Sequence, residues 1–61
     1  MSNISQLELQ NIRHLITAHD NTHHKLTAYA QAATDAQVKQ FFAKSAQCAM
    51  DTKNKLMGLL N

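Results

Sequence analysis

All four histidines of this chain lie in the stretch HLITAHDNTHHKLTAY, residues 14–29. His19 and His23 are four residues apart, so both imidazole rings could reach one ion from the same face of a helix. Asp20 and His24 repeat that spacing. In a homodimer, two copies of the first pair would supply four nitrogen ligands, which suits zinc or copper. The spacing therefore allows a metal site at His19 and His23, for zinc or another divalent transition metal.

The same two histidines also fit a packed polar layer inside a helical bundle. Buried imidazoles usually hydrogen-bond to a hydroxyl, a carbonyl or a water, and Ser45 and Thr52 are candidate partners. Ala46 and Ala49 are small enough to leave room for the rings. Such a layer can fix the register and the oligomeric state of a bundle. This interpretation needs no cofactor, and it is the one we adopt from the sequence.

Catalytic chemistry of other kinds finds little support. The sequence has no glycine-rich phosphate loop, no serine in a strained turn and no pair of carboxylates on one helix face. Cys48 has no activating base near it in sequence, and we expect it to be a small core residue on the side of the first helix. His14 and the Asp20–His24 pair are expected on the solvent side or at the edge of the core. The sequence therefore predicts a protein that is not an enzyme.

Long helices must position these residues. The chain has no proline, and its only glycine is Gly58, so nothing breaks a helix before the C-terminus. Ser5 and Glu8 form a capping box, which predicts a first helix over about 5–33.

A short turn at about 34–35 separates this helix from a second one over about 36–59. Thr34 or Asp35 can cap the second helix, and Thr34 with Gln37 forms another potential capping box. The fold class is therefore all-α, with one domain over 1–61 that forms an antiparallel two-helix hairpin. A single continuous helix is the competing interpretation, and the capping signals at 34–35 disfavour it.

Residues spaced alternately by three and four define the seam, the row of side chains by which each helix faces the other. In the first helix the predicted seam is Leu9, Ile12, Ile16, His19, His23, Leu26, Ala30 and Ala33. In the second it is Val38, Phe42, Ser45, Ala49, Thr52, Leu56 and Leu59. A hairpin turning at 34–35 pairs positions that sum to about 69, which places His19 near Met50 and His23 near Ala46. A lone hairpin leaves its seam half covered, so we expect a homodimer that closes a four-helix bundle, with a tetramer as the alternative.

Composition narrows the classes of partner. A formal net charge of +2 is too small to indicate nucleic acid binding. Lys39, Lys44, Lys53 and Lys55 are expected to form a solvated face. No apolar run is long enough to span a bilayer, and the first residues lack the features of a signal peptide. We expect a soluble, intracellular protein without a nucleic acid or membrane partner.

Nearly the whole chain resembles the ferritin-like spore coat protein F family of endospore-forming bacteria. The similar parts are Leu7–Leu15, the Tyr29-Ala30 pair, the turn 34–39 and the second helix over 41–56. The resemblance implies a ferritin-like four-helix bundle, here completed by dimerisation, and a place in the spore coat or the developing spore.

The chain departs from the metal motif of larger ferritin-like proteins. Its only glutamate is Glu8, at the start of the first helix, and it has no Glu-x-x-His motif. A di-iron centre is therefore not expected, and no catalytic residue is carried over. The leading hypothesis is a non-enzymatic structural protein that associates with itself and with other coat proteins. The alternatives are a small metal-binding bundle using His19 and His23, and an interaction module that accepts the helices of a partner.

Overall fold

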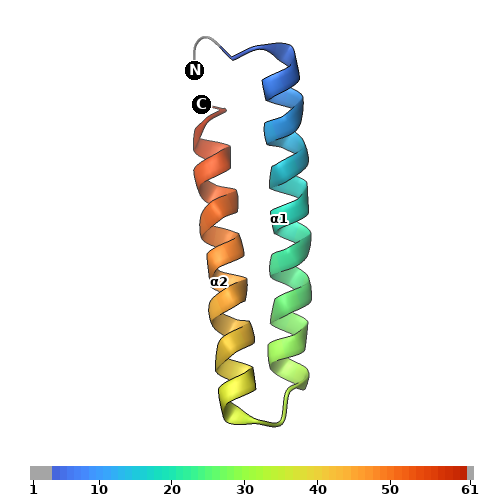
Figure 1. Cartoon of the computed structure of the whole chain (residues 1–61), viewed down its shortest axis with the longest axis vertical. Helices are drawn as coiled ribbons and strands as arrows, with labels where there is room; N and C mark the ends of the chain where they lie inside the picture. The colour runs from blue at the N-terminus through green and yellow to red at the C-terminus, as the bar shows by residue number, and fades with distance from the viewer. Residues whose placement is uncertain (1–3, 61) are drawn as a thin grey trace.

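Two antiparallel helices, α1 (Gln6–Ala32) and α2 (Ala36–Gly58), lie side by side and are joined by a short turn (Figure 1). The structure is a computed structural model, and it describes residues 4–60; the rest of the predicted 1–61 domain lies outside the described residues. Within them there is no strand, so the predictions of an all-α fold and of a helical hairpin are confirmed. The alternative of one continuous helix is wrong, because the chain reverses at 33–35. No helix in the described part of the chain is long and apolar enough to cross a membrane.

The N-terminus of α1 is capped as the sequence predicts. Glu8 N–H donates to Ser5 Oγ, and Ser5 N–H donates to Glu8 Oε1, both at 3.1 Å. The two bonds satisfy backbone donors that the first turn of a helix leaves free. The bond from the Ser5 backbone, helped by the Ser5 side chain, lowers the pKa of the Glu8 carboxyl below its ordinary value.

The turn ends α1 and starts α2 through three hydrogen bonds. Ala33 adopts an extended conformation, and its N–H donates to Tyr29 O at 2.9 Å. Asp35, not Thr34, is the N-cap of α2, because its Oδ1 accepts from Val38 N–H at 2.9 Å. Lys39 Nζ then donates to Ala30 O at 2.8 Å, which ties the first turn of α2 to the last turn of α1. Lys39 is exposed, as expected for a residue of a solvated face, and it makes this bond in addition.

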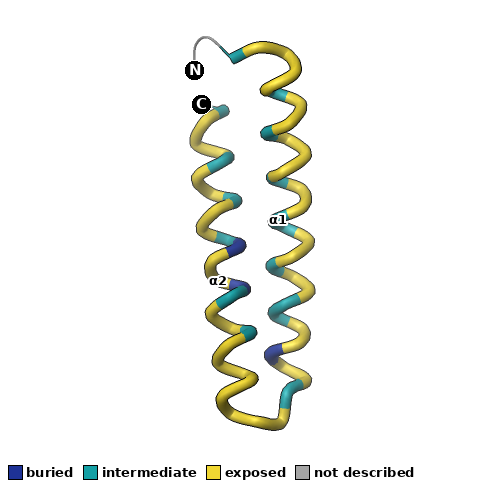
Figure 2. The backbone as a smooth tube through the Cα atoms, in the orientation of Figure 1, coloured by how far each residue is buried: buried dark blue, intermediate teal, exposed yellow. Residues whose placement is uncertain are grey.

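The predicted seam is confirmed on α1 and corrected on α2. All eight residues of the first predicted seam are buried or half-buried. The buried and half-buried positions of α1 follow the edge of the helix that faces α2 (Figure 2). On α2 the confirmed seam residues are Phe42, Ala49 and Leu56. Val38, Thr52 and Leu59 are exposed, so that part of the prediction is wrong. The observed α2 seam runs Phe42, Ala46, Ala49, Lys53, Leu56 and Leu60, with Ser45 and Met50 half-buried beside it.

The core between the helices is thin. Among the described residues only three are buried, and all are alanines: Ala30, Ala46 and Ala49. Small side chains let two helices approach closely, but each removes little apolar surface from water. The prediction of a core position for Cys48 is wrong, because its side chain is exposed.

Candidate functional site

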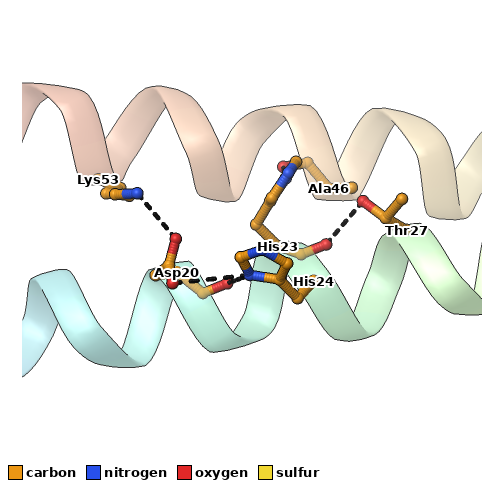
Figure 3. A network of polar contacts seen from close by, with 6 residues as sticks. All are labelled: Asp20, His23, His24, Thr27, Ala46 and Lys53. Atoms are coloured by element: carbon orange, nitrogen blue, oxygen red, sulfur yellow. Dashed lines mark hydrogen bonds and ion pairs between the residues drawn. The ribbon is translucent and has the colours of Figure 1, made fainter.

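His23 spans the two helices at the height predicted from the position of the turn. Its Nδ1 lies 2.9 Å from Ala46 O on α2 (Figure 3). A carbonyl oxygen only accepts, so Nδ1 carries the hydrogen and donates it. In the neutral ring this leaves the lone pair on Nε2. The bond therefore fixes both the orientation of the ring and the nitrogen that stays free.

His19 is held differently, by its own helix. Its Nδ1 donates to Leu15 O at 2.8 Å, one turn earlier in α1. The expected hydroxyl partners, Ser45 and Thr52, make no hydrogen bond to either histidine within residues 4–60. Backbone carbonyls take that role because they lie within reach of a seam side chain, whereas Thr52 is turned outward.

Asp20 and Lys53 form an ion pair between the helices beside His23 (Figure 3). Lys53 Nζ donates to Asp20 Oδ1 at 2.7 Å, and the side chains are 23% and 34% exposed, respectively. The bond from Lys53 lowers the pKa of the Asp20 carboxyl, and the charges of Lys53, His24 and His23 act in the same direction. The prediction that Lys53 lies on a solvated face is therefore wrong, because Asp20 gives its ammonium group a partner within the seam.

His24 lies on the outer side of this ion pair. Its Nδ1 donates to Asp20 O at 2.8 Å and lies 3.6 Å from Asp20 Oδ2. The ring is 71% exposed, which agrees with the solvent position expected for it. It meets the ring of His23 edge-on, with centroids 5.4 Å apart. Thr27 Oγ1 donates to His23 O at 2.8 Å and completes the polar cluster drawn in Figure 3.

The spacing of Lys53 is the signal that could have revealed this ion pair from the sequence. Lys53 follows Ala46 by seven residues and Ala49 by four, so a seam through the two alanines must include it. Once Lys53 is placed there, the nearest acidic side chain on α1 at the same height is Asp20.

The predicted metal ligands keep one nitrogen each for an ion. Nδ1 of His19 and Nδ1 of His23 are both bonded to carbonyls, so Nε2 of each is the nitrogen available to a metal. Metal-bound histidines commonly donate their other N–H in this way. Within residues 4–60 no three side chains of histidine, cysteine, aspartate or glutamate gather as a metal site. The predicted site takes two ligands from each of two chains, and it stays a prediction.

An open hollow runs along one side of the hairpin next to His23. Its volume is about 320 Å³, and it is lined by His23, Thr27, Ala30, Gln31, Lys39, Ala43, Ala46 and Gln47. His19 is not part of this lining. The two predicted ligands thus differ in surroundings as well as in hydrogen-bond partner.

Comparison with known proteins identified no relative of this chain. No protein-family model matches the chain, and searches of curated proteins and of solved structures gave no significant match. The resemblance to the spore coat protein F family therefore stays a prediction from the sequence.

Proposed function

We propose that this chain is a non-enzymatic structural protein, a helical hairpin that associates with itself and completes a four-helix bundle as a homodimer. The observation that carries the proposal is the composition of the core, whose buried residues within 4–60 are three alanines. Seven large apolar side chains in the described part of the chain remain exposed instead. Folded chains of this size are marginal unless something more covers their apolar surface.

The dimensions of the hairpin support the same proposal. Its radius of gyration is 14.3 Å, and its extents are 47 × 14 × 11 Å. A compact domain of this length would have a radius of gyration of about 10.5 Å. A second hairpin laid alongside would thicken the molecule without lengthening it, which is the shape of a four-helix bundle.

The exposed area gives the size of the surface that a partner would cover. The chain exposes 4698 Å², whereas a compact protein of this mass exposes about 4,000 Å². Covering the excess on two chains would bury roughly 1,400 Å² in total, within the range of specific protein interfaces.

The narrower part of the proposal is a place in the spore coat or the developing spore, with other coat proteins as further partners. It rests on the resemblance described for Leu7–Leu15, the turn and α2, and on no structural observation. A soluble, intracellular protein is part of the same proposal.

A second candidate function is metal binding by a dimer through His19 and His23. The observation in its favour is that both rings donate Nδ1–H to carbonyls and keep Nε2 free. An interaction module for the helices of another protein is the third candidate. A stable homodimer that leaves no apolar side chains exposed would contradict the third candidate.

Sedimentation equilibrium of the untagged protein tests the proposed function, with the metal content measured on the same sample. A mass of two chains, independent of added chelator, is the expected result. A monomer at every concentration tested would overturn the proposal. A dimer that holds about half a metal ion per chain and dissociates in chelator would favour the second candidate.

A further inference from the structure

Four of the seven exposed large apolar residues of the described chain lie on one of the two long sides of the hairpin. On α1, Leu15 and Tyr29 lie two heptads apart, and each directly precedes a seam residue, Ile16 or Ala30. On α2, Ser45 and Thr52 likewise precede seam residues, Ala46 and Lys53. Val38 lies seven residues before Ser45, and Leu59 lies seven residues after Thr52. Residues seven apart share one side of a packed helix. We call Leu15, Tyr29, Val38 and Leu59, with the hydroxyl residues Thr22, Ser45 and Thr52 between them, the heptad face.

The open hollow indicates which residues of α1 and α2 share a side of the hairpin. Thr27 and Ala43, which each directly follow a seam residue, line that hollow together. Residues that follow the seam therefore meet on one side of the hairpin. Residues that precede it meet on the opposite side, which places the heptad face away from the hollow.

We infer that a second copy of this chain docks on the heptad face, and this inference rests on the proposed function. None of the seven residues of the heptad face is charged, although Lys25 and Lys55 also directly precede seam residues. Its four apolar residues are between 43% and 49% exposed, so each still has surface to bury. Near the turn, the rings of Tyr29 and Phe42 meet edge-on at 5.6 Å, which extends the apolar surface into the seam.

The order of side chains along the face makes it complementary to itself. Leu15 and Leu59 lie toward the open end of the hairpin, and Tyr29 and Val38 lie toward the turn. The three hydroxyl residues lie between these apolar ends. A copy related by a two-fold axis meets apolar ends with apolar ends and hydroxyls with hydroxyls, as an isologous interface requires.

The test compares two double variants by sedimentation equilibrium, with helicity followed by circular dichroism. Leu15→Glu with Val38→Glu places two charges on the face, and Leu7→Glu with Met57→Glu places two charges on exposed apolar residues outside it. We expect the dissociation constant to rise at least 100-fold for the face variant and to change less than tenfold for the control. A face variant that dimerises like the wild type overturns the inference while leaving self-association intact. A monomeric wild type overturns the proposed function itself.

A mixing experiment keeps the inference testable if the face variant unfolds without its partner. Leu15→Lys with Val38→Lys supplies the opposite charges at the same two positions. Each variant alone should be monomeric, and an equimolar mixture should form a one-to-one complex that weakens in high salt. A mixture that gains neither mass nor helicity would show that the two faces do not meet.

Discussion

Lys53 Nζ lies 2.7 Å from Asp20 Oδ1, joining α2 to α1 through side chains that are 33 residues apart in sequence. The two helices therefore meet through an ion pair at a position where an ordinary hairpin seam would place an apolar residue. Such pairs contribute little net stability, because desolvation of the charges offsets much of their attraction.

Neutralising Asp20 should lower the stability of the hairpin more than replacing Lys53 by an apolar residue. Asp20→Asn should lower the urea midpoint of unfolding, because the ammonium group of Lys53 keeps its half-buried site and loses its counter-ion. Lys53→Met should leave the midpoint unchanged or raise it, since methionine fits the seam and needs no partner. Urea titrations followed by circular dichroism at constant protein concentration would measure both. A larger loss for Lys53→Met would contradict this account.

Acid should remove the contributions of Asp20 and Glu8 to stability. Both carboxyls have folded-state pKa values below their ordinary values of 3.8 and 4.5. The unfolded chain therefore takes up these protons first as the pH falls, and stability falls with it. The contribution should be complete above these ordinary values and disappear as the pH falls through the lowered ones. Thermal melts between pH 2.5 and 6 of the wild type and of Asp20→Asn with Glu8→Gln would measure it, and the difference between the two proteins should shrink toward the acid end.

The close approach of the helices at Ala46 and Ala49 should not tolerate larger side chains. Ala46 is 4% exposed, so Ala46→Leu would push the helices apart, at a cost of about 1–3 kcal/mol. Ala28→Leu, on the exposed side of α1, is the matched control and should change stability by less than about 0.5 kcal/mol. Equal effects of the two substitutions on the free energy of unfolding would show that the alanine contact is unimportant.

The two candidate caps at the turn should respond differently to substitution. Asp35→Ala removes the side chain that accepts from Val38 N–H and should cost about 1 kcal/mol of stability. Thr34→Ala removes a hydroxyl that does not cap the helix in the structure, and it should cost only a few tenths of a kcal/mol. Chemical denaturation of both variants would rank them, and the reverse order would assign the cap to Thr34.

Added zinc should show whether His19 and His23 bind a metal or are only packing residues. If a dimer holds zinc through Nε2 of His19 and His23, an excess of zinc should raise the melting temperature by several degrees. His19→Ala with His23→Ala should remove that rise, whereas His14→Ala should keep it. A wild type whose melting temperature does not respond to zinc would leave both histidines with their carbonyl partners as packing residues.

Periodicity and capping signals predicted the two helices, the Ser5–Glu8 cap of α1 and the α1 seam, because those features depend on neighbouring residues. Each of the eight α1 positions follows from a three-four alternation that includes His19 and His23. On α2 the three-four alternation allows two candidate seams. One runs through Val38, Thr52 and Leu59, and the other runs through Ala46 and Lys53. Side-chain hydrophobicity favours the first seam. The structure takes the second, because alanine allows close approach and Asp20 neutralises Lys53, and neither effect is visible within α2 alone.

For the histidines, too, the sequence predicted some features and missed others. The i, i+4 spacing marked His19 and His23 as related, and the position of the turn placed His23 opposite Ala46. The partners of the rings are backbone oxygens, which every residue carries, so side-chain types could not identify them. Sequence reasoning therefore located the polar layer and missed how each ring is held.

The three buried alanines also determine how the folded state should respond to temperature. The large apolar residues of the seam are only half-buried and the buried residues are alanines, so separating the two helices newly exposes little apolar surface and the heat-capacity change of that step is small. The stability of an isolated hairpin should accordingly vary little between cold and warm conditions. In an associated hairpin, strong curvature of stability with temperature would come from the surface buried between chains, and the melting temperature would then rise with protein concentration.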